Sequence, residues 1–142
     1  MRVIGIDPGQ ATGVAVYENG KLAQLYTLSP DTIENWLTEN TVDLLIFEDS
    51  RGTGKTFTAA KAPSVAAALK IARNVGEIDR LCKDIEAMCK RMGIEAYGVT
   101  PARKGAKRNA AQFAQITGWP KRSSQHARDA AMVAWPYRNK AK

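Results

Sequence analysis

The sequence contains only two cysteines, one histidine and no long hydrophobic run, and each shortage excludes a class of protein. No apolar stretch approaches the roughly 20 residues that a membrane-spanning helix needs. The start, MRVIGIDPGQ, lacks the apolar region of a secretory signal and is typical of a β-strand. Cys82 and Cys89 are about 10 Å apart along an expected helix, too far for a disulfide, and no further cysteine completes a zinc site. We expect a cytoplasmic protein with buried thiols.

Acidic residues are scarce in the last third of the chain. Residues 101–142 contain 10 Lys and Arg but a single acid, Asp129, whereas residues 1–100 contain 11 Lys and Arg and 13 Asp and Glu. This segregation predicts a polyanionic partner, and nucleic acid is the first candidate in an intracellular protein. The alternative is a solubilising basic tail, but a tail would not carry the apolar periodicity of this segment.

Apolar periodicity predicts the element order βββαβαβαα in one α/β domain, residues 1–142, with a mixed five-stranded sheet flanked by helices. The Asn19-Gly20 pair predicts a hairpin turn, and a Gly-, Thr- and Lys-rich stretch at about 49–63 predicts a mobile loop. The expected strands cover residues 3–6, 13–17, 21–28, 43–47 and 94–99, and the expected helices start near Ser29, Ser64, Pro101 and Ser124. Along the Pro101 helix, Ala106, Ala110, Phe113 and Ile116 form the expected inner face, while Lys104, Lys107 and Arg108 point elsewhere.

Three carboxylates occupy positions that predict a metal site. Asp7 and Glu48 each end an apolar strand, and ligands collect at the carboxyl ends of strands in α/β sheets. In the last helix, His126 and Asp129 share a face with apolar residues that dock on the sheet. Converging carboxylates repel unless a cation neutralises them, and hard oxygen ligands suit Mg²⁺ or Mn²⁺. Two such ions ~4 Å apart activate water for attack on a phosphodiester.

Each of these residues also has a simpler interpretation when taken alone. Asp7 before Pro8-Gly9 is ordinary turn chemistry, Glu48 beside Asp49 is compatible with a loop acid, and a single histidine is more often a satisfied helix residue than a ligand. The ordered combination favours the metal site. A nucleotide site is not expected at Gly54-Lys55-Thr56, because Asp49 stands where a phosphate-binding loop requires glycine.

With these motifs the chain resembles the RuvC-type Holliday-junction resolvases of the RNase H-like superfamily, nearly from end to end. The similar segments are Gly5-Ile6-Asp7-Pro8-Gly9 with Thr12-Gly13, Phe47-Glu48, the start of the long helix at Ala68–Gly76, the basic stretch 100–108 and His126-Ala127-Arg128-Asp129-Ala130.

The resemblance implies an RNase H-like fold and a magnesium- or manganese-dependent endonuclease that resolves four-way DNA junctions by paired nicks. It implies that Asp7, Glu48, His126 and Asp129 are catalytic metal ligands that bind two ions per site, and that Lys107 approaches the scissile phosphate. The expected DNA contacts are Arg51, Lys55, Arg103, Lys104, Lys107 and Arg108.

The resemblance also implies a homodimer along the long helix, where Leu81 and Met88 extend the apolar stripe; alternatively these two residues complete the core of one chain. Two other functions stay open: a related nuclease acting on flaps, forks or RNA–DNA hybrids, and a non-cutting nucleic-acid-binding module. A nucleotide-binding ATPase of the actin superfamily is excluded by length, because it needs two such lobes.

Overall fold

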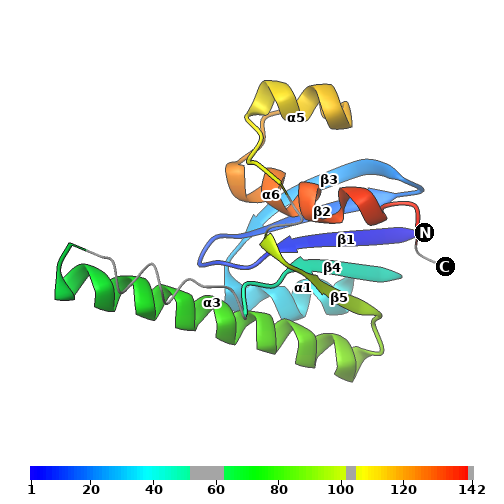
Figure 1. Ribbon diagram of the computed structural model, residues 1–142. Coiled ribbons are helices and arrows are strands. Elements are labelled where there is room, and N and C mark those ends of the chain that lie inside the picture. Colours follow the sequence, from blue (N-terminus) through cyan, green and yellow to red (C-terminus); the bar gives the residue numbers. More distant parts are fainter. Residues whose placement is uncertain (52–62, 102–104, 141–142) are drawn as a thin grey trace.

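A mixed five-stranded sheet, in the order β3-β2-β1-β4-β5, lies between helix α6 on one face and helices α1 and α3 on the other (Figure 1). The computed structural model describes residues 1–51, 63–101 and 105–140. The strands are β1 (Arg2–Asp7), β2 (Thr12–Glu18), β3 (Lys21–Leu28), β4 (Leu44–Glu48) and β5 (Ala96–Val99). The helices are α1 (Ile33–Glu39), α3 (Val65–Met92), α5 (Ala110–Thr117) and α6 (Gln125–Ala134), with short 3₁₀ turns η1 (Pro30–Thr32) and η2 (Trp135–Tyr137). The predicted order of elements is confirmed.

The first three strands form an antiparallel meander, and β1 then pairs in parallel with β4. Asn19 and Gly20 both have positive φ, 51° and 82°, as the central residues of a two-residue hairpin of type I′ require. The turn therefore sets the pairing of Glu18 with Lys21 and of Tyr17 with Leu22, and the register shifts between Val16 and Tyr17. Strand β3 covers the predicted residues 21–28.

Helix α6 lies so close to the sheet at two points that only glycine fits beneath it there. A Cβ atom added to Gly5 would lie 2.2 Å from the carbonyl oxygen of Ala130, and one added to Gly13 would lie 1.9 Å from the carbonyl oxygen of His126. The inward face of α6 is correspondingly small, with Ala130 and Ala134 fully buried. Backbone thus packs against backbone, and this contact fixes the position of the helix over β1 and β2.

Helix α3 covers the opposite face with larger side chains and only along its C-terminal half. Leu81 and Ile85 are buried in the core between this helix and the sheet, and Met88 packs against the same core. The interpretation of Leu81 and Met88 as residues left over for a dimer contact is therefore wrong, because both complete the core of one chain. The N-terminal half of α3 extends beyond the sheet (Figure 1), where Val65 and Leu69 are 77% and 52% exposed.

The expected helix starting at Pro101 is wrong over residues 105–109, which are not helical. Gly105 has a φ of +81°, and helix α5 begins only after Asn109. There Asn109 and Gln112 form a capping box, in which each side chain accepts a hydrogen bond from the backbone N–H of the other. This local cap sets the start of α5, so Lys107 and Arg108 do not share a helix face.

The inner face expected along that helix is also only partly correct. Phe113 is fully buried and Ile116 is half-buried, but Ala106 and Ala110 are exposed. Alanine tolerates either environment, which is why its spacing misled the prediction.

Both cysteines are buried free thiols, as predicted. Burial raises the pKa of Cys82, and it raises the pKa of Cys89 to about 11. Among the described residues, no helix combines the length and the hydrophobicity needed to cross a membrane.

Candidate metal site and nucleic-acid interface

The carboxylates of Asp7 and Glu48 end two neighbouring parallel strands. The register pairs Ile6 of β1 with Phe47 of β4, so the next residue of each strand, Asp7 and Glu48, lies at the same edge of the sheet. Side chains alternate between the two faces of a strand. Val3 and Ile46 belong to the core under α6, and the alternation places Asp7 and Glu48 on that same face.

Helix α6 delivers the third carboxylate to this face. The helix begins after Ser124, whose hydroxyl accepts a hydrogen bond from the backbone N–H of Ala127. Its contacts with Gly13, through His126, and with Gly5, through Ala130, bracket Asp129. Asp129 is 5% exposed and Asp7 is 9% exposed, so two acidic side chains are buried between α6 and the carboxyl end of β1.

His126 lies at the solvent edge of the same group. Its Nδ1 atom is 3.9 Å from Oδ2 of Asp7, and its side chain is 52% exposed. This distance is too long for a direct hydrogen bond. The imidazole can therefore meet both a solvent molecule and the buried carboxylate.

The residue directly after Glu48 belongs to a different environment. Asp49 accepts hydrogen bonds from Arg51 at 2.9 Å, and the Arg51 guanidinium also pairs with Glu86 of α3 at 3.1 Å. The Arg51 guanidinium holds the pKa of the Asp49 carboxyl below its usual range. Of the two adjacent acids, Asp49 is thus bound to a loop arginine, whereas Glu48 is the last residue of a strand.

The donor chemistry of this site fits a hard divalent cation. Carboxylate oxygens are the protein ligands that Mg²⁺ prefers, and Mg²⁺ usually takes only one or two of them while water and substrate phosphates fill the remaining positions. Within residues 1–51, 63–101 and 105–140, no group of three or more His, Cys, Asp and Glu side chains is arranged to hold a metal ion. The carboxylates of Asp7 and Asp129, both buried at this site, are donors of the kind that such an ion takes from protein.

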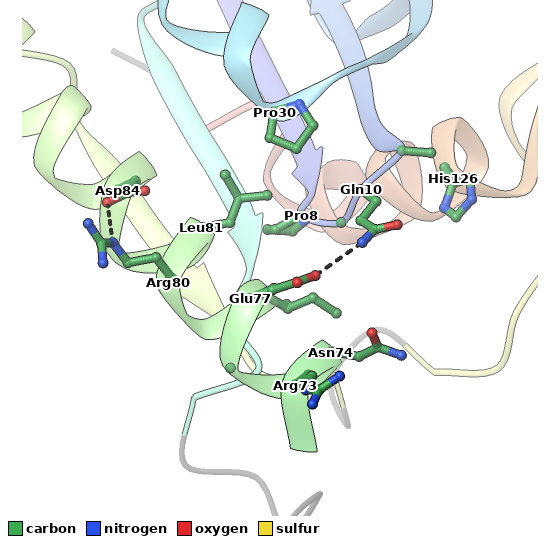
Figure 2. Close-up of a pocket in the computed structure, with 14 residues that line it drawn as sticks. Pro8, Gln10, Pro30, Arg73, Asn74, Glu77, Arg80, Leu81, Asp84 and His126 are labelled. Atoms are coloured by element: carbon green, nitrogen blue, oxygen red, sulfur yellow. Dashed lines mark hydrogen bonds and ion pairs between the residues drawn. The ribbon is translucent and has the colours of Figure 1, made fainter. Parts of the chain in front are cut away.

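A cleft of about 1090 Å³ opens beside this group of residues. Figure 2 shows its walls: the turn after β1 with Pro8 and Gln10 on one side, the middle of α3 from Arg73 to Asp84 on the other, and His126 at the rim. The amide of Gln10 donates a hydrogen bond to Glu77 of α3 at 3.1 Å and links the two walls. The residues that line the cleft include His126 but not Asp7, Glu48 or Asp129. The cleft therefore lies next to the three carboxylates and does not contain them.

The expected DNA contacts are placed only in part. Lys107 is exposed and Arg108 is half-buried, in the segment that leads into α5. Arg51 is engaged with Asp49 and Glu86, as described above. Lys55, Arg103 and Lys104 lie outside the described residues, as does most of the loop expected at 49–63.

Two residues hydrogen-bonded to the site, one directly and one through the other, were not predicted from the sequence. The side-chain amide of Gln125 donates a hydrogen bond to Oδ1 of Asp129 at 2.8 Å, and Arg128 donates one to Oε1 of Gln125 at 3.1 Å. The signal was present, because residues three and four apart are neighbours on a helix surface.

No family model matches the sequence, and no curated protein matches it either. Among solved structures, the chain is similar to RuvC of T. thermophilus in complex with a Holliday junction substrate, with a TM-score of 0.61 and 18% sequence identity. The similarity covers 95% of this chain and 90% of that chain. At this level of identity the similarity establishes the architecture, and it confirms the predicted class: the chain has the RNase H-like fold of RuvC.

Proposed function

We propose that this protein is a magnesium- or manganese-dependent endonuclease that resolves four-way DNA junctions by paired nicks. One observation carries the proposal: strand register and alternation direct Asp7 and Glu48 to the face on which α6 buries Asp129. Asp7 and Asp129 are both buried there, and a bound cation would lower the electrostatic cost of holding two carboxylates together. The similarity to RuvC, solved with a Holliday junction, supports branched DNA as the substrate.

In this proposal Asp7, Glu48 and Asp129 hold the metal, and His126 acts beside them. Bound ions, two in the expected arrangement, would polarise the scissile phosphate and lower the pKa of the attacking water. The chain's own part is positioning: the close packing of α6 on Gly5 and Gly13 holds Asp129 over the strand ends. His126, half-exposed and 3.9 Å from Asp7, orients the attacking water or serves as a further ligand.

The positive charge of the last third would bind the DNA backbone. Lys107 and Arg108 precede α5 in a segment without acidic residues, and we assign them, with Lys55, Arg103 and Lys104, to phosphate contacts. For Arg51 we favour a structural role, in which it links Asp49 to Glu86 of α3. A phosphate contact would compete with these two ion pairs. These contacts position DNA and carry no sequence information by themselves.

Paired nicks require two sites, and we propose a symmetric dimer that forms along the projecting half of α3. Val65 and Leu69 expose apolar surface there. A two-fold axis through this surface would give two equivalent sites for opposed strands. Sedimentation at micromolar concentration tests the dimer, and a monomer both alone and on junction DNA would contradict it.

The test of the proposed site replaces one carboxylate at a time, with Asp7→Asn, Glu48→Gln and Asp129→Asn. Each variant should lose junction cleavage by about 10²-fold or more, above the 10- to 100-fold carried by residues that only support metal ligands. DNA binding should persist or improve, since a negative charge near the phosphate is removed. Matched controls are Asp31→Asn and Glu39→Gln, exposed acids outside the site, which should cut at the wild-type rate.

The choice of substrates separates the proposal from its alternatives. Cleavage in Mg²⁺ is measured on a four-way junction beside a matched duplex, fork, flap and RNA–DNA hybrid. Preferential paired nicking of the junction supports a resolvase. Preference for flaps, forks or hybrids would indicate the related nuclease, and tight binding without cutting in either metal would indicate a non-cutting module.

A further inference from the structure

Arg128 and Gln125 connect the buried Asp129 to the segment that precedes α5. Arg128 donates hydrogen bonds through Nε to the carbonyl oxygen of Arg108 at 3.0 Å and through Nη1 to the carbonyl oxygen of Ser123 at 2.5 Å. Its remaining nitrogen, Nη2, donates to Oε1 of Gln125 at 3.1 Å. Gln125 in turn donates to Oδ1 of Asp129 at 2.8 Å. An unbroken series of hydrogen bonds therefore runs from two backbone carbonyls to a carboxylate of the proposed metal site.

The chemistry of the partners fixes the direction of every bond in this series. A guanidinium has only donors, so the side of the Gln125 amide that faces Arg128 is its oxygen. The amide NH₂ group then has to face the other way, toward the Asp129 carboxylate, which only accepts when ionised. Arg128 thereby selects one of the two amide orientations of Gln125, and it is the orientation that supports a charged Asp129.

The placement of Arg128 is not what helix stability alone would select. It is the fourth residue of α6, close to the positive end of the helix dipole, which disfavours a cation. Both Arg128 and Gln125 are half-buried, so their bonds are sheltered from water. A cation kept in an unfavourable position, with three of its nitrogens engaged, points to a role beyond capping the helix.

We propose that Gln125 and Arg128 are positioning residues that hold the Asp129 carboxylate in the orientation needed to bind the divalent ion. This inference rests on the proposed function, because it assumes that Asp129 is a metal ligand. Arg128 is anchored on the carbonyls of Ser123 and Arg108 and acts through Gln125; neither side chain touches the substrate.

The test measures Mn²⁺ binding directly, by the loss of the free-ion paramagnetic signal, and as the Mn²⁺ concentration that gives half-maximal junction cleavage. Gln125→Leu removes the bond to Asp129, and Arg128→Met keeps most of the side-chain length but removes all donors. Each should raise the dissociation constant for Mn²⁺ and the Mn²⁺ concentration for half-maximal cleavage by roughly 10-fold, the lower range for partners of metal ligands. Excess Mn²⁺ should restore cleavage in both variants, because the ligand itself is intact.

The double variant shows whether the two residues act in series. Once Gln125 is Leu, replacing Arg128 by Met should weaken Mn²⁺ binding no further, whereas independent contributions would add. Gln115→Leu, on the exposed side of α5, is the matched control and should bind Mn²⁺ as the wild type does. Thermal unfolding of every variant without metal separates a local effect from loss of the fold, and Gln125→Met replaces Gln125→Leu if the latter does not fold.

The variant Asp129→Asn, measured in the same way, distinguishes failure of the proposed metal site from failure of the positioning role. If this variant keeps the wild-type Mn²⁺ dependence, the proposed metal site is wrong. If it loses Mn²⁺ affinity while Gln125→Leu and Arg128→Met keep theirs, the metal site stands and the positioning role is overturned. Additive losses in the double variant would likewise overturn the series from Arg128 through Gln125.

Discussion

The two helices that cover the sheet are held to it in different ways. Helix α6 touches the backbone of β1 and β2 at Gly5 and Gly13, where a Cβ atom would collide with a helix carbonyl oxygen. Helix α3 is held at a greater distance by the side chains of Leu81 and Ile85, and only along half of its length. One face of the sheet is therefore fixed by backbone contact and the other by side-chain packing.

This difference agrees with the proposed roles of the two faces, metal binding under α6 and DNA contact beside α3. The three candidate metal ligands all belong to the face under α6, where a contact between two backbones leaves little room for displacement. Catalytic constellations need their groups held within about 0.5 Å, and a helix fixed by backbone contact meets that need. The middle of α3, from Arg73 to Asp84, forms a wall of the open cleft, whose other wall, the turn after β1, meets it through the exposed pair Gln10 and Glu77. A surface that receives DNA can tolerate small shifts of one wall relative to the other.

The largest effect is expected where α6 touches the sheet. In Gly13→Ala the new methyl group would lie 1.9 Å from the His126 carbonyl oxygen, so α6 has to move. We expect the free energy of unfolding to fall by about 3 kcal/mol, the upper end for overpacking, and cleavage to fall with it as His126 and Asp129 are displaced. Chemical denaturation measures the first quantity and a junction-cleavage assay the second.

Gly9→Ala is the matched control for this substitution, in the turn just before β2. A Cβ atom there would lie 3.4 Å from the Ala11 carbonyl oxygen, an ordinary contact, so stability should change by less than about 1 kcal/mol. Equal stability of Gly13→Ala and wild type would mean that α6 does not rest on β2 as described.

A smaller effect is expected from a thiol on the buried face of α3. Burial raises the pKa of Cys89 from 9.0 to about 11, which lowers its thiolate fraction at neutral pH about 100-fold. Because the thiolate is the nucleophile, alkylation of Cys89 at pH 7.5 should be slower than in the unfolded chain by at least that factor. Mass spectrometry of samples quenched with and without guanidinium measures both rates. Rapid native labelling would show that α3 leaves the sheet readily.

The same linkage sets a direction for alkaline pH. The folded chain keeps the Cys89 proton up to a higher pH than the unfolded chain, so stability falls as pH rises from about 9 to 11. Cys89→Ala should reduce this fall, although it also lowers stability at neutral pH by opening a cavity.

The sequence predicted the strands correctly where local turn preferences and apolar patterning indicate the same boundaries. The central strands β1 and β4 are continuous apolar runs that end in an acid, and Asn19-Gly20 selects one kind of turn, so the strand ends could be located without a structure. The shared face of Asp7 and Glu48 then follows from the parallel register, which no single segment contains. The different environments of the adjacent acids Glu48 and Asp49 became visible only in the structure, where Asp49 forms an ion pair with Arg51.

The failures have equally local causes. The helix expected from Pro101 was extended through Ala106 and Ala110 by apolar spacing, although the Asn109 and Gln112 cap was visible as Asn-x-x-Gln. Leu81 was placed outside the core because one narrow stripe was assumed for α3, whereas the sheet buries Leu81 together with Cys82. The link from Gln125 to Asp129 depends on side-chain rotamers, which spacing permits but does not determine.

The smallest effect has the opposite sign to that of Gly13→Ala and lies on α3. Gly76 is inside the helix, and nothing lies within 4 Å of a Cβ atom added there. Alanine is favoured over glycine in a helix interior by 0.8–1.0 kcal/mol, so Gly76→Ala should raise the free energy of unfolding by about that amount. Chemical denaturation at low protein concentration, where single chains dominate, is the appropriate measurement.

Gly93→Ala, at the end of the same helix, makes this measurement decisive. Gly93 also has open space around a Cβ atom, but its φ of +69° is left-handed, a conformation that costs alanine about 1 kcal/mol relative to glycine. The same substitution in the same helix should therefore stabilise at Gly76 and destabilise at Gly93. If Gly76→Ala instead lowers stability, and more so as protein concentration rises, a second copy packs against Gly76. That result would place backbone contact on both helices and remove the contrast between α6 and α3, while supporting the dimer that paired nicking needs.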